Sequence, residues 1–358
     1  MIRLLDQFSA WSSPPALARS LVAGFAAVLM LAPVVARAET TFTIHHFLSP
    51  KALTHEKFLE PWAERVRQQS QGRLRFEIFP SMTLGGAPPD LYRQVRDGTA
   101  DLVWTLAGYT PGVFPRLEVF ELFGVHGASA KATSLAIQDL LPELAPDLAE
   151  VHPVLVHVHG GNALHLVDRQ VGTLADIRGL KLRSPSRTGV WMLEAFGAEP
   201  VGMPVPALPQ ALSAGTIDGA LIPFEVAIPL RIAQFAKHSV ELDGGRRFGT
   251  SVFLFLMNKA RYEALPADLR AIIDANSGSA IVSEVAAAWD EMEPMGIKVA
   301  RDAGRTVTRL DVERSAAFDA AAEAVQARWV GEAKAKGIDA AGLLARAKER
   351  IATHSAGP

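Results

Sequence analysis

Two stretches of the sequence, 117 positions apart, share one pattern. Residues 91–105 read LYRQVRDGTADLVWT, and residues 208–222 read LPQALSAGTIDGALI. Each predicts the end of a helix, a Gly-Thr turn, an aspartate and then an apolar strand. Because the copies lie in different parts of the chain and each follows a predicted strand, they favour two similar α/β lobes. The identical positions are Leu91 and Leu208, Gly98 and Gly215, Thr99 and Thr216, and Asp101 and Asp218.

Strands and helices alternate around these two copies, which favours an α/β architecture over a sandwich. A β-branched and aromatic strand is predicted at 41–47, and the next helix presents Leu53, Phe58, Leu59, Trp62 and Val66 as its buried face. Further strands are predicted at 74–79, 251–257 and 306–310, with a helical region at about 269–292. No low-complexity linker separates the halves, so we expect the lobes to be joined by crossing strands.

The first 38 residues have the features of a secretory signal. An apolar run of fifteen residues, 21–35, follows Arg3 and Arg19 and precedes Ala36-Arg37-Ala38, which predicts cleavage after Ala38. An uncleaved anchor is the alternative, but a bilayer span needs about 20 apolar residues. No later segment reaches that length. We therefore expect a soluble mature protein in the periplasm, without membrane insertion after cleavage.

Composition excludes several kinds of chemistry. The 358-residue chain is 49% hydrophobic and 21% charged, which is ample for a packed core. A net charge of −2 gives no reason to expect nucleic acid as a partner. The absence of cysteine rules out thiol catalysis, thiol redox chemistry and thiolate zinc sites.

The segment GLKLRSPSRTGVW, residues 179–191, predicts a strand followed by a helix. Ser184 offers an N-cap, with Pro185 in the first helical turn. Arg183 therefore stands at the junction, beside the positive end of the helix dipole. Since two positive groups repel each other, the arrangement predicts a bound anion at this point. The alternative is a surface arginine paired with a nearby acid.

Four stretches give the mature chain its resemblance to a known family, from about residue 41 to about 330. They are FPSMTLGGAPPDLYRQVRDGTADLVW, PRLEVFEL, TLADIRGLKLRSPS and ALSAGTIDGALIP. The chain resembles the substrate-binding proteins of tripartite ATP-independent periplasmic (TRAP) transporters. The resemblance implies a two-lobed periplasmic binding protein fold with crossing strands and a long helix that spans both lobes. It also implies a small organic acid as ligand, membrane permease subunits as partners, and Arg183 as the residue that pairs with the ligand carboxylate.

On this basis we expect lobe I at 39–160, completed by about 250–290, and lobe II at 161–249, completed by about 291–350. The resemblance also places Phe47, Leu106, Tyr109 and Val205 along the cleft. Family members that bind sialic acid have an asparagine where this chain has Ile222, and a second arginine near residues 162–164, where this chain has Asn-Ala-Leu. Both departures remove polar recognition, which predicts a carboxylate with an apolar or aromatic body.

Other candidate ligand contacts come from the residues themselves. Tyr109 lies in a loop after a strand, where α/β proteins place ligand contacts, although a packed hinge tyrosine is an alternative. Phe224 and Glu225 follow Pro223, and Glu225 either receives an amine or hydroxyl of the ligand or is a solvated acid at a helix start. His165 is a further candidate contact. Trp104 is expected in the core.

The histidines leave a second class of function open. His45 and His46 are adjacent, and His157-Val158-His159 would point two imidazoles to one face of a strand. Such a pair serves as a metal ligand in hydrolases only with further ligands at suitable spacing, and none is recognisable here. We therefore expect strand-edge or cleft histidines rather than metal ligands. No known catalytic motif is present, so we expect no catalytic residue, metal or cofactor. A metal-dependent periplasmic hydrolase and a ligand sensor for a signalling partner are the alternatives.

Overall fold

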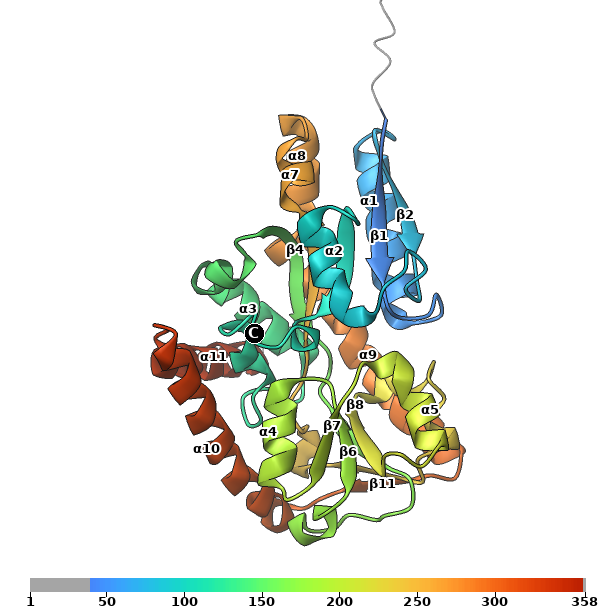
Figure 1. The fold of residues 1–358 in the computed structure, drawn as a ribbon, viewed down its shortest axis with the longest axis vertical. Coiled ribbons are helices and arrows are strands. Elements are labelled where there is room, and N and C mark those ends of the chain that lie inside the picture. The colour runs from blue at the N-terminus through green and yellow to red at the C-terminus, as the bar shows by residue number, and fades with distance from the viewer. Residues whose placement is uncertain (1–38, 357–358) are drawn as a thin grey trace, which may run out of the picture. The chain divides into compact units, whose positions relative to one another are not determined.

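The strands between residues 39 and 356, the part of the chain that this computed structural model describes, form two mixed sheets (Figure 1). The predicted signal segment and its cleavage site lie outside the described residues. The first sheet has the order β2 (Leu74–Phe79), β1 (Thr40–His46), β3 (Leu102–Leu106), β10 (Val252–Asn258), β4 (Val151–Val158). The second has the order β11 (Thr306–Arg309), β9 (His238–Glu241), β5 (Ala163–Leu166), β8 (Gly219–Ile222), β6 (Lys181–Ser184), β7 (Glu199–Gly202).

Each sheet contains three neighbouring parallel strands, and these are arranged in the same way in both sheets. In the first sheet β1 lies between β2 and β3, and in the second β6 lies between β7 and β8. An antiparallel strand then pairs with the third member, β10 with β3 and β5 with β8. The two similar α/β lobes expected from the sequence are therefore confirmed, each with its own sheet.

The repeated aspartate has the same structural role in both lobes. Asp101 precedes β3, and its carboxylate accepts a hydrogen bond from the backbone N–H of Thr43 in the neighbouring β1, at 2.9 Å. Asp218 precedes β8 and accepts from the backbone N–H of Lys181 in the neighbouring β6, at 2.7 Å. In each lobe the carboxylate thus connects the strand that follows it, β3 or β8, to the neighbouring parallel strand, β1 or β6. This shared role explains why both copies of the repeat have an aspartate at this position.

Two chain crossings connect the sheets. The chain passes from β4 to β5 through Gly160 and Gly161, and it returns from β9 to β10 through residues 242–251. The crossings are hydrogen-bonded to each other, because the N–H of Asn162 donates to the oxygen of Gly249 and the N–H of Phe248 donates to the oxygen of Asn162, both at 2.8 Å. The expected crossing strands are present.

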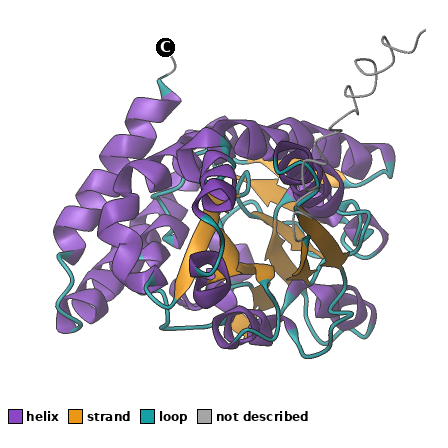
Figure 2. Cartoon of the chain, turned by 90° about the horizontal axis from the view of Figure 1, so that it is seen from above, coloured by secondary structure: helices purple, strands orange, loops and turns teal. Residues whose placement is uncertain are grey.

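Helices surround the strands, which lie in the middle of the view in Figure 2. The long helix α9 contacts α3 and β4 beside the first sheet and α6 and β11 beside the second, so the expected lobe-spanning helix is confirmed. The single helical region expected at 269–292 is instead two helices, since Gly278 adopts a positive φ between them. The helices are α1 (Glu60–Gln69), α2 (Leu91–Asp97), α3 (Ala130–Leu144), α4 (Arg187–Ala195), α5 (Leu208–Ser213), α6 (Phe224–Ala227), α7 (Lys259–Glu263), α8 (Ala267–Ala275), α9 (Val282–Asp302), α10 (Val312–Ala335) and α11 (Ala340–Ser355).

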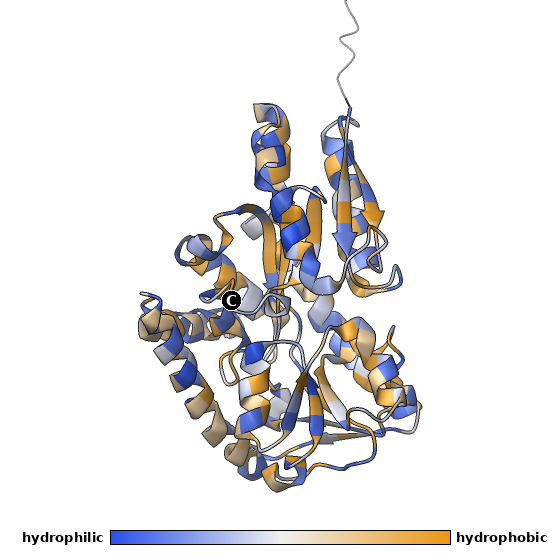
Figure 3. Cartoon of the chain, viewed as in Figure 1, coloured by the Kyte–Doolittle hydropathy of each residue, from blue (hydrophilic) through white to orange (hydrophobic). Residues whose placement is uncertain are grey.

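The apolar residues gather on the strands, while the helices alternate apolar and polar positions (Figure 3). All seven residues of β10 are buried, as its continuous apolar sequence VFLFLMN predicts for a strand covered on both faces. Among the helices between residues 39 and 356, none combines the length and apolarity that a membrane crossing would require.

Candidate ligand-binding site

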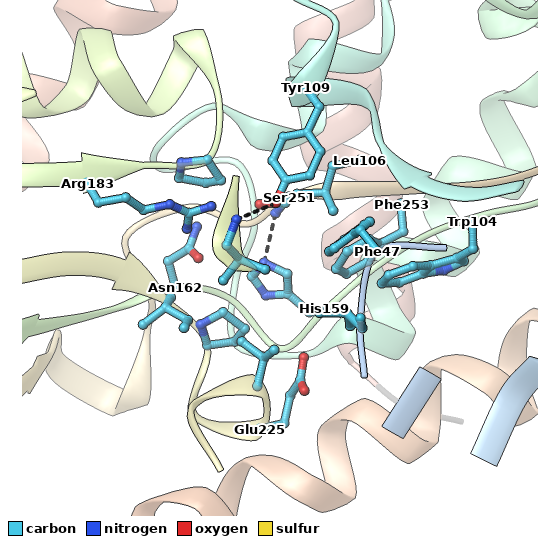
Figure 4. Close-up of a pocket in the computed structure, with 16 residues that line it drawn as sticks. Phe47, Trp104, Leu106, Tyr109, His159, Asn162, Arg183, Glu225, Ser251 and Phe253 are labelled. Carbon is cyan, nitrogen blue, oxygen red and sulfur yellow. Dashed lines mark hydrogen bonds between the residues drawn. The ribbon is translucent and has the colours of Figure 1, made fainter. Parts of the chain in front are cut away.

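The carboxyl ends of parallel strands from both sheets meet at one pocket (Figure 4). This is the edge at which open α/β sheets bind ligands, because the loops that follow the strands converge there. About 380 Å³ of space at this pocket, part of it open to solvent, is not filled by protein atoms. Its lining comprises Phe47, Leu48, Trp104, Leu106, Tyr109, His159, Asn162, Arg183, Pro185, Val205, Ile222, Pro223, Glu225, Val226, Ser251 and Phe253.

Arg183 is the cation of this pocket and is only 2% exposed. Its Nε donates to the backbone oxygen of Met203 and its Nη1 to that of Leu221, both at 2.9 Å. Its Nη2 has no hydrogen-bond partner, and no carboxylate of the described chain forms an ion pair with the guanidinium. Burial lowers the pKa of Arg183, yet an arginine side chain stays protonated in proteins. The site therefore contains a buried positive charge with a free donor.

The helix beside Arg183 starts two residues later than the sequence suggested. Ser184 is the last residue of β6, and Ser186 is the N-cap of α4, accepting from the backbone N–H of Gly189 at 3.2 Å. The expected N-cap at Ser184 is wrong, and Pro185 precedes the helix and lines the pocket instead. Ser184 instead donates from its hydroxyl to the backbone oxygen of Ser186, at 2.9 Å, and so stabilises the turn into the helix.

Aromatic rings form the wall on the opposite side of the pocket from Arg183 in the view of Figure 4. The ring of Trp104 stacks against those of Phe47 and Phe253, with centroids 5.2 and 4.4 Å apart. The ring of Tyr109 meets Phe47 edge-on at 5.3 Å. Trp104 is fully buried, as expected of a core residue, but it also lines the pocket. The expectation of a core position is confirmed, and the same side chain also contributes to the pocket wall.

Tyr109 connects the two lobes at the pocket. It ends the short helix η3 (Ala107–Tyr109) after β3, and its hydroxyl accepts a hydrogen bond from the backbone N–H of Val205, at 2.9 Å. Val205 opens the short helix η7 (Val205–Ala207) after β7 of the other sheet. Burial raises the pKa of the Tyr109 phenol, which keeps the ring neutral, and the nearby Arg183 acts against this shift.

Glu225 lies in the first turn of α6 and is only 6% exposed, so the alternative of a solvated helix-start acid is wrong. Burial raises the pKa of its carboxyl group well above the ordinary value, and the neighbouring carboxyl of Glu293 raises it further. The backbone N–H of Glu225 donates to Oε1 of Glu293 at 3.1 Å. Burial likewise raises the pKa of Glu293, to about 7. The pocket is therefore lined by a carboxyl group whose surroundings favour its protonated form.

Seven of the nine residues singled out in the sequence meet in this pocket, and two do not. His165 and Phe224 line a separate cavity behind the pocket. The imidazole of His165 lies within hydrogen-bond distance of the Ile222 backbone oxygen, at 3.2 Å, and of the Ser239 hydroxyl, at 2.9 Å. The Phe224 ring packs under the guanidinium of Arg247, 5.5 Å away. Both side chains thus have partners within the protein. The seven are Phe47, Leu106, Tyr109, Arg183, Val205, Ile222 and Glu225.

The four side chains of the histidine pairs are buried, and His159 among them lines the pocket. Burial lowers the pKa of His46 and of His157 to about 3, so both are neutral. His157 accepts a hydrogen bond from the indole of Trp104 at 3.1 Å, and His46 lies 2.9 Å from His55. Within residues 39–356 no group of three or more His, Asp or Glu side chains has an arrangement that could hold a metal ion.

Several pocket residues that were not singled out as ligand contacts from the sequence lie at the crossings between the sheets. His159 and Asn162 follow β4, while Ser251 and Phe253 lie at the start of β10. The backbone N–H of Ser251 donates to Nε2 of His159 at 3.1 Å (Figure 4). About ninety residues separate these partners, and no local pattern in the sequence indicates their pairing.

A pocket bounded by both lobes of a two-sheet α/β fold with crossing strands defines a two-lobed binding protein. Residues 44–332 match the profile of the family described as bacterial extracellular solute-binding protein, family 7. A solute-binding protein from Verminephrobacter eiseniae is 28% identical over 299 residues, which cover 82% of this chain and 86% of the relative. The chain belongs to this family.

Solved structures place the chain among the TRAP solute-binding proteins. A marine metagenome protein described as specific for aromatic acid ligands, crystallised with 3-hydroxybenzoate, is 41% identical with a TM-score of 0.86. One from Rhodoferax ferrireducens, in complex with copurified benzoate, is 38% identical with a TM-score of 0.86. Each alignment covers 88% of this chain and 99% of the other. The resemblance proposed from the sequence is confirmed, and the chain is a solute-binding protein of the type that captures organic acids for TRAP transporters.

Proposed function

We propose that this protein captures an aromatic monocarboxylate in the periplasm. The observation that carries the proposal is the guanidinium of Arg183, which is buried at the pocket with its Nη2 unpartnered and no protein carboxylate beside it. A buried charge without a counter-ion is unfavourable, so the site is built to receive an anion. A carboxylate matches the planar donor fork of a guanidinium.

The rest of the pocket favours an aromatic body for that carboxylate. Phe47, Trp104 and Phe253 present ring faces and edges, and aromatic pairs add about 0.5–1.5 kcal/mol beyond area burial. Charged hydrogen bonds contribute about 1.5–3 kcal/mol each, and micromolar binding needs about 8 kcal/mol. Arg183 alone is therefore insufficient, and the apolar wall supplies the remainder. The complexes of two relatives with benzoate and 3-hydroxybenzoate support this ligand class.

The proposed ligand contacts are the seven pocket residues expected from the sequence together with Trp104 and Phe253. Phe224 and His165 are left out, because they line the cavity behind the pocket. We propose that lobes I and II, bounded as expected from the sequence, close on the ligand about the hydrogen-bonded crossings at Asn162 and Gly249. The loaded protein then delivers the acid to TRAP permease subunits and performs no chemistry on it.

Titration calorimetry of the purified mature chain with benzoate, phenylacetate and succinate tests this function. The two aromatic acids should bind with micromolar or lower Kd and the aliphatic diacid should not. Arg183→Ala should weaken binding by 100-fold or more, since two charged hydrogen bonds are lost. Lys181→Ala changes an exposed cation two residues earlier on the same strand and should leave affinity within 2-fold. Equal binding by Arg183→Ala, or no binding of either aromatic acid by the parent, would contradict the proposal.

A further inference from the structure

Glu225 faces the same pocket as Arg183 but from a different side. Arg183 reaches the pocket from β6, whereas Glu225 enters it from α6, which follows β8. In the view of Figure 4 the carboxyl group of Glu225 lies below the pocket, on the side opposite Tyr109. A ligand whose carboxylate is held by Arg183 therefore presents another part of its body to Glu225.

No side chain of the described residues neutralises Glu225. Arg247, whose guanidinium lies over the ring of the preceding Phe224, forms ion pairs with Glu241 and Glu293, while no ion pair of the described residues includes Glu225. Its neighbour Glu293 is itself an acid and accepts the backbone N–H of Glu225. Burial and an adjacent carboxyl both oppose ionisation, and they outweigh the hydrogen bond from Trp289 that favours it. The surroundings of Glu225 thus favour the neutral carboxylic acid at this side of the pocket.

A neutral carboxylic acid offers one O–H donor and one carbonyl acceptor. A hydroxyl group also has one donor and can accept, so the two groups are complementary. An ammonium group on the ligand would need the ionised form of Glu225, which its surroundings disfavour. A second carboxylate would need a second cation, and Arg183 is the one arginine or lysine among the residues that line the pocket.

We infer that Glu225 selects, among aromatic carboxylates, those that carry a hydroxyl group on the ring, by hydrogen bonding to that hydroxyl. This inference rests on the proposed function and deepens it, because it assigns a second recognition point to the same site. Arg183 would fix one end of the ligand and Glu225 would distinguish hydroxylated from unsubstituted rings. The aromatic wall would hold the ring between them.

The test compares benzoate with 3-hydroxybenzoate, 4-hydroxybenzoate and 3-(aminomethyl)benzoate by titration calorimetry. The parent protein should bind at least one hydroxybenzoate about 3- to 10-fold tighter than benzoate, the effect of one neutral hydrogen bond. Glu225→Met has an apolar chain of similar length and should remove that preference, so that benzoate and the hydroxybenzoates bind the variant with about equal affinity. Glu225→Gln keeps a donor and an acceptor and should retain the preference. Glu121→Gln is the matched control, since it changes a buried carboxyl that does not line the pocket, and the preference should be unchanged.

The outcomes separate this inference from the proposed function. If benzoate binds but neither hydroxybenzoate binds more tightly, or if Glu225→Met weakens all ligands equally, the inference is wrong while the proposed function stands. Tighter binding of 3-(aminomethyl)benzoate than of the hydroxybenzoates would also overturn it, because Glu225 would then act as an anion. Loss of the preference in Glu225→Gln contradicts it as well, and this variant gives a result even if Glu225→Met does not fold. Failure of every aromatic acid to bind the parent protein would instead refute the proposed function.

Discussion

The hydroxyl of Tyr109 accepts the backbone N–H of Val205 at 2.9 Å, and this hydrogen bond joins the two lobes at the mouth of the pocket. Tyr109 follows the third strand of the first sheet and Val205 follows β7 of the second, and both side chains line the pocket. A bond of this kind forms only when the lobes are together. In the closing motion proposed above, it would hold the lobes together over a bound ligand.

Tyr109→Phe should weaken binding about 2- to 10-fold, because one hydrogen bond of the closed form is lost while the ring remains. The loss should appear as faster dissociation rather than slower association. Stopped-flow fluorescence with an aromatic acid measures both rates. Tyr92→Phe is the control, since its hydroxyl donates to Glu150 at 3.1 Å outside the pocket. An unchanged dissociation rate in Tyr109→Phe would show that the bond does not hold the lobes closed.

The absence of a side chain at Gly108 should also be required for the two lobes to come into contact. A Cβ atom at this position would lie 2.6 Å from Cβ of Ser186 and 2.9 Å from the backbone oxygen of Pro185, which belong to the other lobe. Gly108→Ala should therefore weaken ligand binding at least 10-fold and leave the lobes further apart in small-angle scattering of the ligand-saturated protein. Gly127→Ala introduces a methyl group where no atom lies within 4 Å and should behave as the parent. Parent-like affinity in Gly108→Ala would contradict a close contact at this point.

The two-lobe fold could be predicted because its signals are local. The Gly-Thr-x-Asp repeat depends only on one turn and on one neighbouring strand. Asp101 and Asp218 each accept a hydrogen bond from the backbone of that neighbouring strand. The place of Arg183 at the pocket could be predicted from the family resemblance, whereas the local pattern, a cation beside a helix start, left a surface arginine open as an alternative. Only the structure shows that no carboxylate of the described residues forms an ion pair with Arg183 and that its Nη2 has no hydrogen-bond partner.

The rest of the pocket depends on contacts between distant segments. His159 and Ser251 meet because two crossings pair with each other, and no periodicity encodes that pairing. The burial of Glu225 depends on Glu293, 68 positions away on α9, so the sequence left a solvated acid as an alternative. Trp104 shows a further limit of prediction from sequence. An apolar strand predicts that its side chains are buried in the core, but it does not indicate which of them also border a cavity.

Glu121 makes the stability of the protein depend on pH. Its carboxyl group is buried, accepts the backbone N–H of Val252 at 3.0 Å and lies 3.3 Å from the hydroxyl of Thr188. Burial is the main cause that raises its pKa to about 7, and the neighbouring Glu118 adds to the shift. Between pH 4.5 and 7 the folded protein therefore retains a proton at Glu121 that the unfolded chain has lost. The resulting stabilisation is complete below pH 4.5 and is lost as the pH rises through 7.

Glu121→Gln removes this titration while keeping a side-chain oxygen that can accept from Val252. The free energy of unfolding of the variant, relative to the parent, should rise between pH 4.5 and 7 by up to about 3 kcal/mol. Urea denaturation at half-unit pH steps measures this difference, and subtracting the parent curve cancels the titration of the buried histidines and of Glu293. A difference between variant and parent that stays constant over this range would mean that Glu121 is already ionised in the folded protein at pH 5, in spite of its burial.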